Sequence, residues 1–355
     1  MTEQPFRQTP LFQLNLLVWL SMPARGEWIT PIFWHNGFEL YAIGPSILVP
    51  ADARLRFNAS SGRGRMAGSV SPDLLMRNES NQSLVTVECK VNSFGLASDT
   101  AMQALGILAC TGRYVADFFG WSQSNHWSAW VTYAVSHPQQ TQMSETLIVL
   151  GEQLKAVGVD QCPATAVGID VAPDGVYLDF SALPQLPLNV SGRQKVMSLK
   201  TGEDPRPLYL LPLDPSVDAQ DDYGKRVIQE RLRAAFASTV ASRLYLGSFV
   251  VTWEELMGEA LQIWPLWKDR DSRRNLLRQT KVYVRKILDE IGRSGITTET
   301  NANGFTLAGV DRSSAQQIRR YLTGVAYRHG ELDLWQEGVQ LGFDDVNGWK
   351  PDSEG

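Results

Sequence analysis

SPDLLMRNESNQSLVTVECK, residues 71–90, is the stretch that decides the fold class and the candidate chemistry of this chain. Two runs rich in apolar and β-branched residues, near 69–76 and over 84–91, enclose the polar segment RNESNQS at 77–83. Such runs, separated by turn-forming residues, predict a β-hairpin. The hairpin is therefore the starting point for placing the side chains of this stretch.

The second strand of the hairpin has two different faces. Side chains two apart along a strand share a face. One face is entirely apolar and is expected to meet a core: Val85, Val87, Cys89 and Val91. The other face presents Glu88 beside Lys90, and the partner strand can bring Asp73 alongside. The apolar face favours a central strand; the alternative is an exposed Glu–Lys pair at the edge of a sheet.

These residue types suit hydrolysis of a phosphodiester. Two neighbouring carboxylates repel each other unless a cation neutralises them. Mg²⁺, or Mn²⁺ in its place, takes oxygen ligands and keeps several waters. A bound divalent cation can generate hydroxide from water and stabilise charge on a scissile phosphate. A lysine beside it can orient the water or stabilise the charge of the transition state.

The pattern resembles the PD-(D/E)xK nuclease superfamily, to which restriction endonucleases and many repair nucleases belong. The resemblance is carried by Pro72, Asp73, Glu88 and Lys90, and the last two form the only (D/E)-x-K in the chain. It implies a restriction-endonuclease-like α/β fold, a mixed sheet flanked by helices. It also implies that Asp73 and Glu88 bind metal and that Lys90 assists catalysis.

The same resemblance implies two further site residues. Many members carry a polar residue on the helix after the motif, and Gln103 occupies that place. Some members have a tyrosine four positions later, where this chain has Ile107. Families often add an acidic metal ligand upstream, and Glu39 is the best candidate for it.

The rest of the first half predicts strands interleaved with helices, which indicates an α/β domain. Ser98 and Asp99 can cap a helix to about residue 119. A small, polar and basic segment at 51–68 reads as a loop. The other expected elements are a helix or strand near 11–21, strands near 28–34, 38–49, 127–136, 165–171 and 175–180, and a helix near 144–157.

The second half is basic and mainly helical. Residues 224–330 hold 18 Lys and Arg against 10 Asp and Glu, a net charge of about +8 in a chain whose total is −5. Such asymmetry indicates contact with nucleic acid. Thr252 and Glu255 form a capping box. The expected helices are 224–245, 252–263, 270–292 and 313–327, with a hairpin around the turn 301–304, an order that resembles a winged helix-turn-helix.

A basic stripe runs along the expected helix 270–292. Its members recur at steps of three or four residues, with Arg273 beside them: Arg270, Arg274, Arg278, Lys281 and Arg285. The opposite side is apolar and should face a core. Such a stripe can follow DNA phosphates. The alternative is a solvated helix with intrahelical pairs such as Arg285 with Asp289. Arg63 and Arg65 are a second candidate for DNA contact, or part of a solvated loop.

Composition sets the remaining expectations. No apolar run is long enough to span a bilayer, so we expect no membrane association and a cytoplasmic location. The three widely spaced cysteines predict reduced, buried thiols. We expect a nuclease-like domain at 1–190, a Pro-rich linker at 191–222, a basic winged-helix-like DNA-binding domain at 223–330 and an acidic tail at 331–355.

The leading hypothesis from the sequence is a metal-dependent DNA endonuclease of the restriction or antiphage-defence type. A homodimer, or an ATPase or helicase partner, is implied because one site cuts one strand. The principal alternative is a non-catalytic DNA-binding adaptor on a nuclease-like scaffold. A transposon-end nuclease and an RNA nuclease share the same chemistry and remain alternatives.

Overall fold

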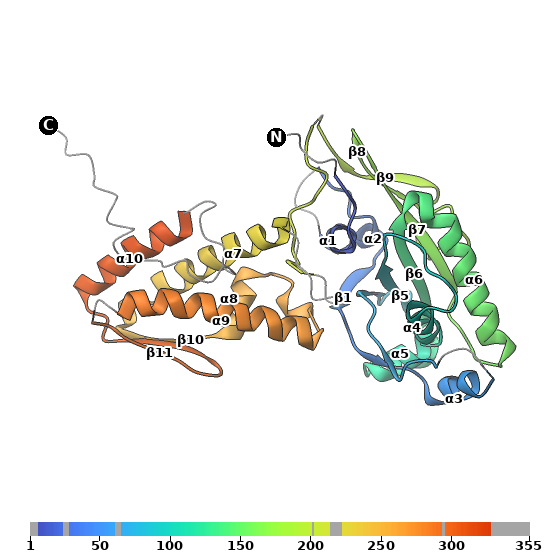
Figure 1. The fold of residues 1–355 in the computed structure, drawn as a ribbon, viewed down its shortest axis with the longest axis horizontal. Helices are drawn as coiled ribbons and strands as arrows, with labels where there is room; N and C mark the ends of the chain where they lie inside the picture. Colours follow the sequence, from blue (N-terminus) through green and yellow to red (C-terminus); the bar gives the residue numbers. More distant parts are fainter. Residues whose placement is uncertain are drawn as a thin grey trace. The chain divides into compact units, whose positions relative to one another are not determined.

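Two compact units make up the chain in the computed structural model (Figure 1). The structure describes residues 6–23, 28–60, 65–200, 202–213, 222–292 and 295–327. Unit 1 comprises Met1–Leu208, Asp214–Val217 and Leu266–Asp269, and unit 2 comprises Tyr209–Leu213, Asp218–Pro265 and Arg270–Gly355. The expected acidic tail at 331–355 lies outside the described residues.

Unit 1 is built on a mixed seven-stranded sheet, as the α/β expectation requires. The strand order is β1-β4-β5-β6-β7-β8-β9, with β5, β6 and β7 parallel and every other neighbouring pair antiparallel. The strands are β1 Glu39–Ile43, β4 Leu74–Asn78, β5 Ser83–Cys89, β6 Ser128–Ser136, β7 Ala164–Ala172, β8 Gly175–Asp179 and β9 Arg193–Ser198. The hairpin predicted for 69–91 is therefore present as β4 and β5, and β5 is a central strand.

Helices cover both faces of this sheet. Helices α4 (Asp99–Leu108) and α6 (Gln140–Ala156) share one apolar core with the strands, and α1 (Pro10–Leu20) contacts β5 from the other side (Figure 1). Every residue of β5 is consequently buried. The side of β5 that carries Glu88 is thus covered as well as its apolar side.

The helix expected from Ser98 to residue 119 is two helices, α4 and α5 (Gly112–Phe118). Ser98 caps α4 by accepting a hydrogen bond from the amide of Ala101, as predicted, and Thr111 caps α5 by accepting from the amide of Tyr114. Gly112 suits the break, because a Cβ there would lie 2.3 Å from the carbonyl oxygen of Trp127.

Three predictions for unit 1 are wrong. The expected loop at 51–68 begins with helix α3 (Ala51–Ser60), whose Ala53 and Phe57 are buried one turn apart. The expected strand at 28–34 contains the short helix α2 (Ile32–His35). Strand β9 lies inside the expected linker. Its six residues pair with β8 at the edge of the sheet, although the segments on both sides are rich in proline. A minor two-stranded sheet joins β2 (Ile47–Leu48) to β3 (Ser69–Val70).

Unit 2 follows the order helix, strand, helix, helix, strand, strand, helix. Its three-stranded antiparallel sheet has the order β10-β12-β11. The elements are α7 Asp222–Ala241, β10 Ser248–Thr252, α8 Trp253–Ala260, α9 Arg270–Gly292, β11 Thr297–Thr300, β12 Gly304–Ala308 and α10 Arg312–Tyr327. The Thr252 half of the predicted capping box is confirmed, since the Thr252 hydroxyl accepts a hydrogen bond from the amide of Glu255, whereas the Glu255 carboxylate pairs with Arg243.

Two further composition-based expectations concern thiols and membranes. Cys89, Cys110 and Cys162 are free and buried, as predicted. Across the described part of the chain, no helix combines the length and the apolar character that a bilayer span requires.

Candidate functional site

Asp73, which directly precedes β4, lies beside Glu88 of the neighbouring strand β5 in unit 1. Leu74 pairs with Val87 across β4 and β5, and continuing that register by one residue sets Asp73 opposite Glu88 on the same face. The Asp73 carboxylate also reaches along the strand end, where its Oδ2 accepts a hydrogen bond of 2.6 Å from the Cys89 amide. Both side chains are buried, with 3% of Asp73 and 1% of Glu88 exposed.

Lys90 and Gln103 both approach the Glu88 carboxylate. The Lys90 ammonium lies 3.0 Å from Glu88 Oε1, as expected for residues two apart on one strand face. Gln103 extends from α4, and its Nε2 lies 3.4 Å from the same oxygen, at the long end of hydrogen-bond distances. Four of the residues expected at the site are thus brought together around one carboxylate pair: Asp73, Glu88, Lys90 and Gln103.

Glu39 is not part of this cluster, so the expectation that it is a third carboxylate of the site is wrong. The register pairs Glu39 with Arg77, whereas Ile43, at the other end of β1, pairs with Leu74 beside Asp73. Four residues of strand separate the two positions by about 13 Å. Among the described residues, no three His, Cys, Asp or Glu side chains gather into a metal-binding group.

Tyr133 is a member of the site that the sequence did not indicate. It pairs with Glu88 across the parallel strands β5 and β6, and its side chain is fully buried. Burial, together with the charges of Glu88 and Asp73, raises the pKa of its hydroxyl well above the usual value. No local pattern reveals this neighbour, because the register of two parallel strands 45 residues apart is set by packing.

The carboxylate pair has the donor chemistry that a hard divalent cation requires. Mg²⁺ is commonly held by one or two carboxylates and completes its shell with water or phosphate oxygens. Asp73 and Glu88 supply two such carboxylates from adjacent strands. Their burial makes the pair costly without a compensating positive charge, and Lys90 supplies one in this structure. The residues present therefore fit Mg²⁺ or Mn²⁺.

A cavity of about 670 Å³ opens at the same edge of the sheet. Val91, which directly follows Lys90, lines it together with Ser136 at the end of β6 and Ala172 at the end of β7. Ligands of open α/β sheets bind at the carboxyl ends of parallel strands. The cavity lies at this end of the sheet, but Val91 belongs to the strand face opposite Glu88, and the described lining includes neither Asp73 nor Glu88.

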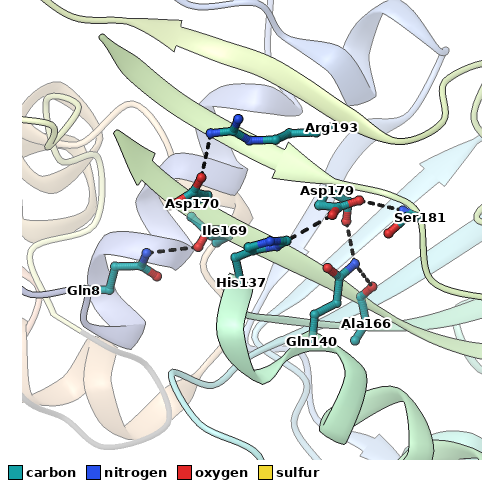
Figure 2. A network of polar contacts seen from close by, with 9 residues as sticks. All are labelled: Gln8, His137, Gln140, Ala166, Ile169, Asp170, Asp179, Ser181 and Arg193. Atoms are coloured by element: carbon teal, nitrogen blue, oxygen red, sulfur yellow. Dashed lines mark hydrogen bonds and ion pairs between the residues drawn. The ribbon is translucent and has the colours of Figure 1, made fainter. Parts of the chain in front are cut away.

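A polar network beside this cavity holds the start of α6 against the sheet (Figure 2). The Gln140 amide donates to the carbonyl oxygens of Asp179, at 2.8 Å, and Ala166, at 3.2 Å. His137 lies with its Nδ1 3.6 Å from the Asp179 carboxylate. A Cβ on Gly168 would sit 2.6 Å from Gln140 Oε1, so a larger residue there would displace the Gln140 side chain. These contacts fasten α6 over the face that carries Glu88.

The basic stripe of α9 in unit 2 is solvent-facing. Arg270, Arg274, Arg278 and Arg285 are exposed, and Lys281 is half-buried. Lys281 donates to the carbonyl of Ala302 at 3.1 Å and Arg285 to the hydroxyl of Thr300 at 3.3 Å, so both reach the β11–β12 hairpin. Within the described residues, the ion pair of this stripe joins Arg274 to Asp271 at 3.3 Å, and the Arg285–Asp289 pair that the alternative expected is absent.

Arg273 does not belong to that stripe. Its guanidinium lies 4.1 Å from the centre of the Trp264 ring and donates to Glu254 Oε2 at 2.7 Å. Arg273 therefore has partners within its own unit, and its assignment to DNA binding stays a prediction. Of the second candidate pair, Arg65 is exposed and Arg63 lies outside the described residues.

Comparison of the chain with family models, with curated proteins and with solved structures finds no match. What the site can do therefore rests on its own geometry and chemistry.

Proposed function

We propose that this chain is a metal-dependent DNA endonuclease whose reaction site is the Asp73–Glu88–Lys90 cluster. The observation that carries the proposal is the juxtaposition of two buried carboxylates and one lysine at the end of a central strand. Each residue has the role that hydrolysis of a phosphodiester needs. Buried charged groups of this kind are costly, and a cluster of them is a candidate functional site.

Asp73 and Glu88 are the residues that would hold Mg²⁺ or Mn²⁺. When bound, the cation would supply positive charge at the scissile phosphate and make a nearby water more acidic. Asp73 is held for this role by the Cys89 amide, which fixes one of its oxygens. Lys90, which is bonded to Glu88, provides a second positive charge for the developing negative charge on the phosphate. Gln103 orients Glu88 from the side of α4.

Duplex DNA binding is assigned to unit 2. The order of its elements and the strand order β10-β12-β11 support a winged-helix-like domain in which α9 enters the major groove. The exposed arginines of α9 support phosphate contact, because Arg278 and Arg285 have only neutral partners among the described residues. A homodimer, or an ATPase or helicase partner, would be needed to cut both strands.

A non-catalytic adaptor is the second candidate. Two observations favour it: Lys90 already neutralises Glu88, and a third carboxylate is not gathered near the pair in the described part of the chain. In that case unit 1 would be a scaffold, and DNA binding by unit 2 would be the whole activity.

Nicking of supercoiled plasmid by the purified full chain with Mg²⁺ or Mn²⁺ separates the two functions. We expect wild type to nick, and Asp73→Asn and Lys90→Ala to be inactive. Glu39→Gln is the matched control, since it also removes a carboxylate of unit 1 but lies opposite Arg77. Cleavage that survives in all variants would refute the assigned site. DNA binding without cleavage by wild type would favour the adaptor. Single-stranded DNA and RNA, offered in parallel, test the other substrates.

A further inference from the structure

One hydroxyl beside the carboxylate pair lacks a partner. Tyr133 is 0% exposed, and its oxygen makes no hydrogen bond within the described residues. Leaving a buried polar group unsatisfied costs about 1–3 kcal/mol. Such groups are few in native proteins, and a bound water or ion is one explanation for them.

The position of Tyr133 indicates what that molecule is. Tyr133 follows Glu88 in the row that crosses the sheet from β4 to β6, on the face that α4 and α6 cover. Glu88 and Asp73 are the charges that act on its hydroxyl. The ring is held by Phe94, whose centroid lies 5.6 Å away, so the side chain has little freedom to seek another acceptor.

We propose that the Tyr133 hydroxyl is a hydrogen-bond donor to the oxygen shell of a divalent cation held by Asp73 and Glu88. The inference rests on the proposed function, because it needs the cation, and it adds a residue outside the motif. A cation surrounded by water presents oxygens beyond the carboxylates themselves, and a neutral phenol can donate to them. The role is one of positioning: Tyr133 orders the shell and does not itself bind the metal.

This role predicts that one substitution will have effects of opposite sign on stability and on binding. Tyr133→Phe removes only the oxygen. Without metal the variant should unfold at the same temperature as wild type or slightly higher, because an unsatisfied hydroxyl has been removed. With Mn²⁺ it should gain less stability, and its Mn²⁺ dissociation constant should rise about three- to tenfold, the range of one net hydrogen bond. If the hydroxyl had only a structural role, Tyr133→Phe would instead lower the unfolding temperature without metal.

Tyr283→Phe is the matched control. Tyr283 is also buried with an unbonded hydroxyl in the described structure, but it lies on α9 in unit 2. We would measure Mn²⁺ binding by calorimetry and thermal unfolding with and without MnCl₂, on the full chain. Weaker Mn²⁺ binding in Tyr133→Phe alone supports the inference.

Two other outcomes would overturn it. If both phenylalanine variants bind Mn²⁺ as wild type does, and Asp73→Asn does not, the cation site stands and the role of Tyr133 is refuted. If wild type itself does not bind Mn²⁺, the inference fails together with the cation site on which the proposed function depends.

Discussion

Lys90 and Glu88 form an ion pair of 3.0 Å in which the carboxylate is almost completely buried and the ammonium is only partly so. The pair lies along one strand, two residues apart, at the end where β5 leaves the sheet. Lys90 therefore does two things in the structure. It offsets the cost of burying Glu88, and in the proposed nuclease it would compete with the metal ion for the same carboxylate.

The first role predicts that Lys90→Met destabilises the protein. The methionine keeps the apolar part of the side chain and leaves Glu88 buried without its positive charge. We expect a loss of about 1–3 kcal/mol in the free energy of unfolding, measured by urea denaturation. The double variant Lys90→Met, Glu88→Gln should recover most of it. Lys155→Met is the control, because its exposed pair with Glu152 at 4.0 Å should contribute little. A single Lys90 variant as stable as wild type would contradict this prediction.

The second role predicts that the same substitution strengthens cation binding while it abolishes cleavage. Removing the ammonium removes a positive charge that competes for Glu88, so the Mn²⁺ dissociation constant should fall several-fold. Activity should be lost, because the positive charge that assists at the phosphate is gone. Calorimetry measures Mn²⁺ binding and plasmid nicking measures cleavage, both on the same preparation of the variant. Weaker Mn²⁺ binding by Lys90→Met would show that Lys90 supports the cation site and does not compete with it.

For unit 2 the prediction concerns the salt dependence of DNA binding. Arg278→Ala and Arg285→Ala should each weaken duplex binding and reduce the slope of log affinity against log salt by about 1, since each removes one phosphate contact. Arg113→Ala, an exposed arginine of unit 1, changes the net charge equally and should leave the slope unchanged. Fluorescence anisotropy over a salt series measures it. Unchanged slopes in both α9 variants would show that this face of α9 does not contact DNA phosphates.

The sequence predicted best those elements whose signals are local. Helix α9 begins and ends at the residues expected, and Thr252 caps α8, because both depend on side chains within one or two turns. The Glu88–Lys90 pair was predictable for the same reason, since strand alternation alone sets it.

What the sequence did not reveal depends on contacts between distant segments. Glu39 is excluded from the site by the pairing of β1 with β4, and Arg273 pairs with Glu254 and Trp264, which precede it by 19 and 9 residues. Tyr133 meets Glu88 only through parallel pairing. A short polar segment was also assigned wrongly. The composition of 51–60 favoured a loop, whereas the segment forms helix α3, which buries two residues four apart.

The buried thiols give a prediction about reactivity. Burial raises the pKa of Cys110 to about 12, and it raises that of Cys162 still more. The thiolate is the nucleophile, so at pH 8, below both values, these residues stay protonated. We expect iodoacetamide to leave Cys110 and Cys162 unmodified in the native protein and to alkylate both after unfolding in guanidinium. Mass spectrometry of the digests measures this. Rapid native alkylation of either residue would show that its surroundings open to solvent.

The last prediction concerns how α9 would read a base sequence. Val282 is 47% exposed and lies one turn from Arg278, on the solvent-facing side of the helix. In the major groove, the C5-methyl group of thymine is the apolar feature that a base edge presents. Val282 placed there would favour thymine.

Duplexes in which deoxyuridine replaces thymidine test this directly, since only the methyl group changes. We expect wild type to bind the uracil duplex about two- to fivefold more weakly, at roughly 0.8 kcal/mol for one buried methyl-sized group. Val282→Ser should bind both duplexes equally, because its side chain offers no apolar contact. The salt slope should be the same for the two proteins, since no phosphate contact is altered. If Val282→Ser retains the wild-type preference for thymine, another residue of unit 2 makes that contact.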